Sequence, residues 1–225
     1  MIKAVIFDLD GVIADTEPFY DNILGDFFAK NDVLIDQKTR RTLTGLTSKK
    51  IQNQILVQWW ADAGKGPITE EEVDALLEDH MDAFRAGGGV PYAKLKDPDI
   101  QSLVAILKER GYKLAIASGS TMKDIERAAH EIELESYMDI LVSGEMFKES
   151  KPNPEIYNYT VNKLGLKKEE CLVVEDSTYG IQAAKAAGLI TVAKRDDRFA
   201  FDQSHADFMV DRLSQLEEVL GNINR

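Results

Sequence analysis

The fold is decided by the stretch KAVIFDLDGV at residues 3–12. Its apolar run ends at a charged residue, which predicts a short strand buried on both faces, as in a parallel sheet. Side chains alternate along an extended chain, so Asp8 and Asp10 are expected to point to the same side. Gly11 permits a sharp turn off the sheet. Two such carboxylates repel each other unless a cation or a proton is present. Taken alone, the two acids also fit a solvated loop, and the rest of the chain decides between these two interpretations.

Four later apolar runs repeat the pattern of a short buried strand. They lie at residues 113–117, 138–142, 171–174 and 189–193. Helical patterns follow or separate them, at residues 100–110, 122–132, 154–164, 180–187 and 213–220. Strands that alternate with helices imply crossover connections and a parallel sheet. The predicted fold is therefore α/β, with a doubly wound parallel sheet and a Rossmann-like core.

The alternation is interrupted between the first strand and residue 100. Residues 17–86 have helical character, and the segment ADTE at 14–17 and three glycines at 87–89 flank them. We interpret the flanking segments as hinges, because successive glycines are costly in an ordered core. We therefore predict two domains, namely an α/β core of residues 1–15 and 91–225 and an inserted helical domain of residues 16–90.

The net charge of the chain limits the kinds of partner it can bind. The 225 residues carry a formal net charge of -12, which argues against binding to nucleic-acid phosphates or anionic membranes. No stretch approaches the about 18 apolar residues of a membrane span, and acids in the first ten residues do not fit a signal peptide. Cys171 is the only cysteine, so no disulfide can form within the chain. We expect a cytoplasmic monomer that binds neither nucleic acid nor membrane.

Two neighbouring strands of such a sheet end in acids. If the strand order reverses after the third strand, the strand at 171–174 lies beside the first strand. Glu175 and Asp176 would then join Asp8 and Asp10 in one crevice. A phosphate ester would not enter such a site unaided. We therefore expect a hard cation with oxygen ligands, Mg²⁺, at these four acids.

Two further segments supply groups for an anion. Lys151 offers a fixed positive charge, although alone it would be taken as a surface lysine before a helix. Ser118 and the backbone N–H groups that follow it, beginning at Gly119, can hold phosphoryl oxygens. Alone, Ser118 would be taken as a turn residue. Together with the acids, these residues predict a site for a phosphate ester.

Four segments in chain order resemble the haloacid dehalogenase superfamily in its phosphatase form. They are DLDGVIADT at residues 8–16, Ser118 after the strand, KPNPEIY at 151–157, and VVEDSTYGIQAA at 173–184. Four such segments in order are far more specific than any one of them, and the resemblance extends over the whole chain. It implies a Mg²⁺-dependent enzyme in which Asp8 attacks phosphorus and forms an aspartyl-phosphate.

The resemblance also implies the roles of the other residues. Asp10 would protonate the leaving alcohol and then take a proton from the attacking water. Asp8 and Asp176 would give carboxylates to Mg²⁺, and Asp10 its backbone carbonyl. Glu175 would contact metal-bound water or orient Lys151, which neutralises the nucleophile and the phosphate.

The spacing of the motifs places the cap. About thirty residues separate Ser118 from Lys151, which leaves no room for a cap there, so residues 16–90 must supply the lid. This arrangement is similar to the subgroup with β-phosphoglucomutase and small sugar-phosphate phosphatases. The candidates for substrate contact in the cap are Thr16, Glu17, Tyr20, Thr47 and Lys49.

Departures from the subgroup favour hydrolysis. Tyr20 stands where a histidine is common, and Ser48 stands where mutase-like members have an arginine for the second phosphate. A lysine such as Lys49 lacks the bidentate fork of arginine. We expect a phosphatase for a small phosphorylated metabolite, a sugar or polyol phosphate, with a β-phosphoglucomutase-type mutase as the alternative. A receiver-type signalling module and a non-catalytic binding protein are the rivals from other classes.

Overall fold

The computed structural model describes residues 1–44 and 49–225 of the chain. They form two compact units. The first, here called the core, contains Met1–Asp15 and Tyr92–Arg225, and the second, here called the helical unit, contains Thr16–Pro91. Each unit is described by itself.

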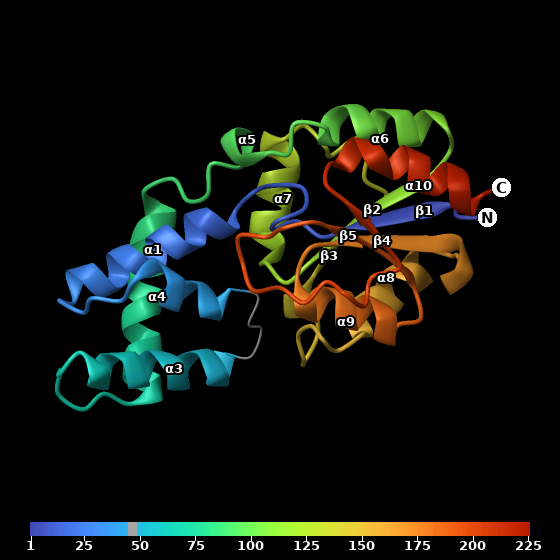
Figure 1. The fold of residues 1–225 in the computed structure, drawn as a ribbon. Helices are drawn as coiled ribbons and strands as arrows, with labels where there is room; N and C mark the ends of the chain where they lie inside the picture. Colours follow the sequence, from blue (N-terminus) through green and yellow to red (C-terminus); the bar gives the residue numbers. More distant parts are fainter. Residues whose placement is uncertain (45–48) are drawn as a thin grey trace. The chain divides into compact units, whose positions relative to one another are not determined.

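The core is built on one parallel sheet (Figure 1). Its strands are β1 (Ala4–Phe7), β2 (Lys113–Ser118), β3 (Ile140–Ser143), β4 (Cys171–Glu175), β5 (Ile190–Lys194) and β6 (Phe208–Val210). Their order is β3-β2-β1-β4-β5-β6, and neighbouring strands pair in parallel. The prediction that the fourth strand lies beside the first is confirmed, because β1 pairs with β4 in register Phe7 to Val174. The doubly wound α/β fold is confirmed with it.

Helices cover both faces of this sheet. The helices of the core are α5 (Tyr92–Leu95), α6 (Ile100–Glu109), α7 (Met122–Glu131), α8 (Glu155–Leu164), α9 (Thr178–Ala186) and α10 (Leu216–Ile223). Short 3₁₀ turns lie at Gly144–Met146, Lys168–Glu170 and Leu213–Gln215. In Figure 1, α6 and α10 lie over one face, and α8 and α9 lie over the other. Strands β1 and β4 are buried along their whole length, which explains their unbroken apolar runs.

Strand β6 was not expected from the sequence. Its three residues include Phe208 and Met209, which are exposed, and only Val210 is buried. It pairs with β5 alone and is the edge of the sheet. A strand this short, with one buried residue, leaves no periodic signal in the sequence.

The helical unit contains four α-helices among its described residues. They are α1 (Glu17–Lys30), α2 (Gln37–Arg40), α3 (Lys49–Asp62) and α4 (Glu70–Ala86), with a 3₁₀ turn at Arg41–Leu43. The helical character predicted for this part of the chain is confirmed for α1, α3 and α4. Thr69 caps α4 in a capping box with Glu72, which fixes where that helix begins. The core of this unit contains Phe28 and Trp59, whose ring centroids are 5.7 Å apart.

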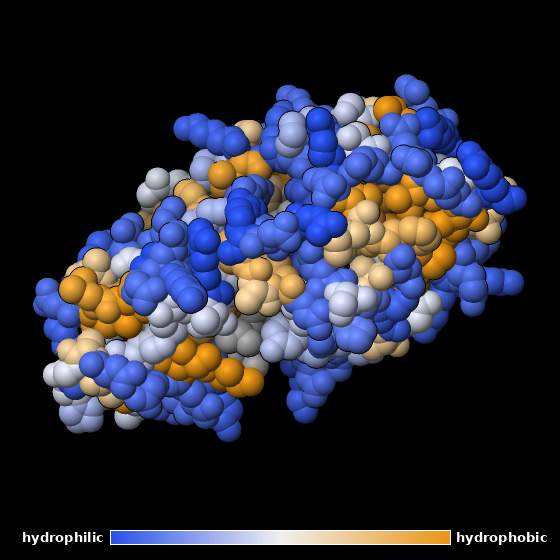
Figure 2. Space-filling model, viewed as in Figure 1, coloured by the Kyte–Doolittle hydropathy of each residue, from blue (hydrophilic) through white to orange (hydrophobic). Residues whose placement is uncertain are grey.

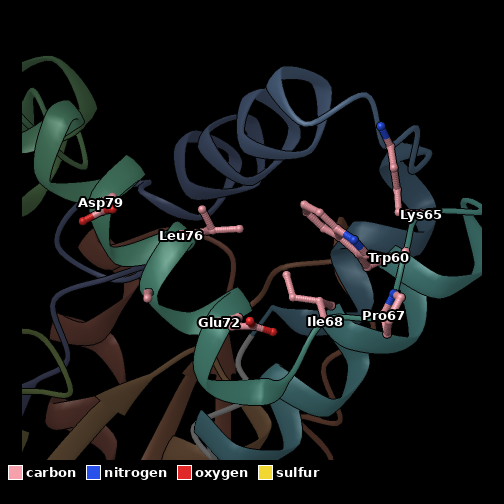
Figure 3. A pocket seen from close by; sticks show the side chains of 9 residues that line it. Trp60, Lys65, Pro67, Ile68, Glu72, Leu76 and Asp79 are labelled. Carbon is pink, nitrogen blue, oxygen red and sulfur yellow. The ribbon is translucent and has the colours of Figure 1, made fainter.

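Trp60, which follows Trp59 in the sequence, has a different environment. Trp60 is half-buried and lines a hollow of about 540 Å³ between α4 and the segment after α3 (Figure 3). The lining combines apolar and charged residues, namely Trp60, Lys65, Gly66, Pro67, Ile68, Glu72, Ala75, Leu76 and Asp79. Trp59 therefore lies in the core of the helical unit, and Trp60 packs against that core and lines the hollow.

The outer surface is mostly polar. Figure 2 shows hydrophilic side chains over most of the visible face, in line with the 29% of residues that are charged. Among the described residues, no helix is both long enough and apolar enough to cross a bilayer.

Candidate active site

Three acids meet where β1 and β4 end. The Asp8 amide donates to the Val174 carbonyl at 3.0 Å, which continues the strand pairing by one residue and brings Asp8 beside Glu175. Asp176 follows directly. Carboxylate oxygens of Asp8, Glu175 and Asp176 lie within 4.8 Å of one another, and all three residues are buried. This is the sheet edge at which doubly wound proteins bind ligands.

Lys151 lies between two of these acids. Its Nζ is 2.7 Å from Asp8 Oδ1 and 2.7 Å from Glu175 Oε1, and it also donates to the Ala117 carbonyl at 3.2 Å. The residue is only 6% exposed. A buried ammonium is stable when it is paired and hydrogen-bonded in this way. The predicted proximity of Lys151 to the acids is therefore present in the structure.

Glu175 is held by its own set of donors. The Tyr157 hydroxyl donates to Oε1 at 2.7 Å, and the Ser177 hydroxyl donates to Oε2 at 3.1 Å. The backbone N–H groups of Asp176 and Ser177 also donate to Oε2, at 3.1 and 3.3 Å. With these partners and Lys151, Glu175 is placed to fix the lysine.

The sequence did not single out Tyr157 or Ser177. Tyr157 lies in α8 within the segment 151–157, and Ser177 is the N-cap of α9, accepting a hydrogen bond from the Gly180 N–H at 3.0 Å. A serine before a helix is an N-cap signal, but that signal does not indicate a contact with Glu175. The hydroxyl of Tyr157 gives no sequence signal of its partner.

The acids carry more charge than Lys151 can balance. Burial raises the pKa of Asp8 to about 8, and the Glu175 and Asp10 carboxylates add to the rise while Lys151 opposes it. Burial also acts on Glu175, but Lys151 and the hydroxyl donors outweigh it and lower that pKa. For Lys151, the attraction of Asp8 and Glu175 outweighs burial and raises the pKa well above its usual value. Three buried carboxylates against one ammonium are an oxygen donor set that suits a hard divalent cation such as Mg²⁺.

Asp10 lies outside this group of three. Its Oδ2 accepts a hydrogen bond from Ser120 Oγ at 2.6 Å, and Ser118 Oγ lies at 3.4 Å. The alternation of side chains from which the direction of Asp10 was predicted applies only to an extended chain. Strand β1 ends at Phe7, and the chain then turns, because the N–H groups of residues 13 and 14 both bond to the Leu9 carbonyl, at 2.9 and 3.0 Å. Side chains do not alternate through a turn.

The loop after β2 faces Asp10. Ser118 is buried, and its hydroxyl accepts a hydrogen bond from the Ser120 N–H at 3.0 Å. Ser143 at the end of β3 donates to the Ser120 carbonyl at 2.7 Å and so fixes the loop from its other side. Gly119, between the two serines, is exposed. Its role in phosphate binding, like that of Ser118, stays a prediction.

The expected substrate residues of the helical unit lie in two places. Thr16 is buried at the start of α1, and Glu17 and Tyr20 in its first turn are half-buried. Lys49 begins α3, and its ammonium pairs within the unit with Asp74 at 3.0 Å and more distantly with another acid of α4.

Thr47 lies outside the described residues. Substrate contact by Thr16, Glu17, Tyr20, Thr47 and Lys49 stays a prediction.

Comparison with known proteins identifies the family. The model described as haloacid dehalogenase-like hydrolase matches residues 5–194, so the chain belongs to the haloacid dehalogenase-like hydrolases. The chain is 30% identical over 229 residues to hexitol phosphatase B of Escherichia coli K12, with 98% of this chain and 97% of that protein covered. It is 28% identical to a phosphorylated carbohydrates phosphatase of Thermotoga maritima, over 84% of this chain and 82% of that one.

A solved structure is similar over the whole length. β-Phosphoglucomutase from Clostridium difficile has a TM-score of 0.78 and 25% identity, and the match covers 100% of this chain and 98% of that one. The predicted resemblance to the phosphatase and β-phosphoglucomutase-like subgroup is thereby confirmed. The chain is an enzyme, a phosphatase of the haloacid dehalogenase-like type.

Proposed function

We propose that this phosphatase hydrolyses a small sugar or polyol phosphate through an aspartyl-phosphate on Asp8. One observation supports this most directly, namely the different surroundings of the two aspartates. The Asp8 carboxylate is buried beside Lys151, whereas that of Asp10 is half-buried and bonded to a serine hydroxyl. A nucleophile needs a fixed position next to a positive charge, and an acid–base group needs access to the leaving alcohol and to water.

The reaction then has two displacements at phosphorus. A carboxylate oxygen of Asp8 forms a bond to phosphorus while the bond to the alcohol oxygen breaks, and Asp10 gives its proton to that oxygen. Asp10 next takes a proton from a water that attacks the aspartyl-phosphate, which frees Asp8 and inorganic phosphate. Lys151 holds Asp8 in place throughout and offsets the charge of the phosphoryl group. Ser118 and the N–H of Gly119 are proposed to bind phosphoryl oxygens.

The donor set supports Mg²⁺ as the cofactor. Asp8 and Asp176 would hold it with carboxylate oxygens and Asp10 with its backbone carbonyl. Glu175, whose oxygens already accept five hydrogen bonds from Lys151, Tyr157 and the chain at 176–177, would act through Lys151. A bound divalent cation neutralises phosphate and carboxylates so that they can approach each other.

The helical unit is proposed to be the cap that selects the substrate. Relatives of the chain include a hexitol phosphatase and a phosphorylated carbohydrates phosphatase, which supports a polyol or sugar phosphate. The mutase alternative requires a cation in the cap for a second phosphate. Lys49 is already paired with Asp74, which favours hydrolysis. The likeness to a β-phosphoglucomutase structure keeps the mutase as the second candidate.

The test is a Mg²⁺-dependent screen of phosphorylated sugars and polyols that measures released phosphate. β-Glucose 1-phosphate with its bisphosphate is included, and glucose 6-phosphate is measured separately. We expect free phosphate from a polyol or sugar phosphate and no turnover by the Asp8→Asn variant. Efficient formation of glucose 6-phosphate with little free phosphate would establish the mutase instead. Release of phosphate by Asp8→Asn at a near-normal rate would exclude the aspartyl-phosphate.

A further inference from the structure

The turn that carries Asp10 is fixed from one side by Asp176 and from the other by a lysine of a different strand. Gly11 has φ +77°, and a Cβ at this position would lie 1.9 Å from Asp176 Oδ2. The turn therefore has no freedom to move toward Asp176. Its N–H groups are used internally, for example Gly11 N to Ala14 O at 2.8 Å. The carbonyls of Gly11 and Val12 take no part in these bonds within the turn.

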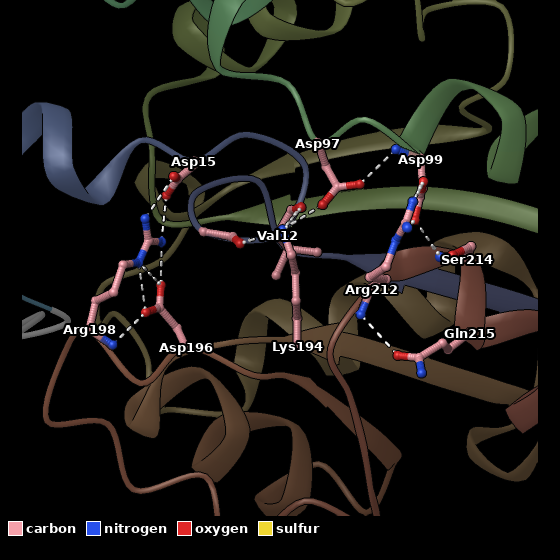
Figure 4. Close-up of polar contacts among 11 residues, drawn as sticks. Val12, Asp15, Asp97, Asp99, Lys194, Asp196, Arg198, Arg212, Ser214 and Gln215 are labelled. Atoms are coloured by element: carbon pink, nitrogen blue, oxygen red, sulfur yellow. Dashed lines mark hydrogen bonds and ion pairs between the residues drawn. The ribbon is translucent and has the colours of Figure 1, made fainter.

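Lys194 donates to both of those carbonyls (Figure 4). It is the last residue of β5, and its Nζ lies 3.1 Å from the Gly11 carbonyl and 3.0 Å from the Val12 carbonyl. The side chain is only 14% exposed, so water competes little for these bonds. Hydrogen bonds from an ammonium are about twice as strong as those between neutral groups.

An ion pair with Asp97 fixes the position of the Lys194 ammonium. Its Oδ2 pairs with Lys194 Nζ at 2.8 Å, and its Oδ1 accepts from the Asp99 N–H at 2.9 Å. The N–H of Asp97 donates to the Ile13 carbonyl at 2.8 Å. The carbonyls of three successive turn residues are therefore all bound by Lys194 or Asp97. The turn is built to hold one conformation.

We propose that Lys194 is a positioning residue for Asp10, the acid–base group of the proposed function on which this inference rests. The Asp10 side chain is oriented by Ser120, and its backbone is held by the Lys194 contacts to the next two residues. Without the ammonium, the carbonyls of two buried residues lose their donor and the turn shifts. A displacement near 1 Å at an acid–base group costs about 10²-fold in rate.

The experiment compares two probes, β-glycerol phosphate and p-nitrophenyl phosphate, with Mg²⁺ present. p-Nitrophenolate leaves without a proton, whereas the glycerol oxygen needs one, so only p-nitrophenyl phosphate bypasses the acid. Rapid quench measures the formation of the phosphorylated enzyme for each. For Lys194→Met we expect this step to slow about 10–100-fold with β-glycerol phosphate and less than about 3-fold with p-nitrophenyl phosphate. The double variant Lys194→Met/Asp10→Asn should be no slower than Asp10→Asn alone.

Controls separate positioning from loss of fold. Lys185→Met removes another lysine–carboxylate ion pair of the core, in which Lys185 Nζ lies 2.6 Å from Asp207 Oδ2. This variant should leave the rate of phosphorylation unchanged with both probes. If Lys194→Met does not fold, the Asp97→Asn variant is measured instead. It should also slow phosphorylation more with β-glycerol phosphate than with p-nitrophenyl phosphate, by a smaller factor than expected for Lys194→Met. Equal losses on both probes in the folded variant would overturn the role of Lys194. If Asp10→Asn itself shows no dependence on the leaving group, the proposed function fails rather than this inference.

Discussion

Replacing Gly180 by alanine should damage the site, although it adds a better helix former. Gly180 lies in the first turn of α9, and a Cβ there would lie 1.9 Å from Glu175 Oε1 and 2.2 Å from Oε2. Contacts of a real Cβ below 3.0 Å essentially do not occur. Either the carboxylate or the helix must therefore move by about 1 Å or more, and hydrogen bonds do not survive such a displacement at full strength.

The opposing contributions can be compared. Exchanging glycine for alanine inside a helix stabilises a protein by about 1 kcal/mol at most. Displacing Glu175 weakens its ion pair with Lys151 and its bonds from Tyr157 and Ser177. Breaking a buried ion pair costs about 3–5 kcal/mol. We therefore expect Gly180→Ala to lower the free energy of unfolding by about 2–4 kcal/mol.

A matched variant isolates the effect. Gly221 also lies in a helix, α10, is exposed, and has nothing within 4 Å of a Cβ. Gly221→Ala should raise the free energy of unfolding by up to about 1 kcal/mol. Urea unfolding of both variants gives the comparison, and turnover should fall only in Gly180→Ala, because Lys151 moves with Glu175. A Gly180→Ala protein as stable and as active as the wild type would refute the reasoning.

Further variants and conditions test the same site. Asp8→Asn should abolish turnover and Asp10→Asn should lower it by about 10²–10⁴-fold, with the fold of both unchanged by circular dichroism. Tyr157→Phe removes a buried donor to Glu175 at 2.7 Å and should lower the free energy of unfolding by about 1–3 kcal/mol, measured in urea. In metal-free protein the pKa of Asp8 is raised to about 8 from an ordinary 3.8, so between these pH values the folded state holds a proton that the unfolded chain releases. The stability from this proton is present below about pH 4 and is lost as the pH rises to about 8. Mg²⁺ would displace that proton, so its increase of the melting temperature should be larger at pH 8 than at pH 6, and an equal increase at both would count against the site. Chelation should stop turnover, Mg²⁺ should restore it, and Ca²⁺, with its larger and looser ligand shell, should bind without restoring it.

The sequence was informative wherever a side chain follows directly from a regular element. Asp8, Glu175 and Asp176 follow buried strands, and parallel strands end at the same edge of a sheet, so their meeting could be predicted from strand order alone. The position of Lys151 could not be predicted from strand order, because the residue lies in a loop before α8. Its placement came from the family resemblance rather than from any periodicity.

Where a regular element ends, the same reasoning lost its basis. The prediction that Asp8 and Asp10 point to the same side used an alternation that holds only for an extended chain, and β1 stops at Phe7. The turn that follows accepts hydrogen bonds from Lys194, which is 183 residues from Gly11 in the sequence. No local pattern encodes a contact over that distance.

The residues that hold the reactive groups are therefore harder to predict than the reactive groups themselves. A nucleophile or an acid must have one of a few side-chain types, and this chemical requirement makes Asp8 and Asp10 recognisable. A holding residue needs only a donor within reach, which Lys194 supplies from β5 and Tyr157 supplies from α8. Many side chains could meet that need from many positions, so the tertiary fold alone selects among them. Variants of such residues consequently test the structure more directly than variants of the aspartates, whose loss of activity the motif already predicts.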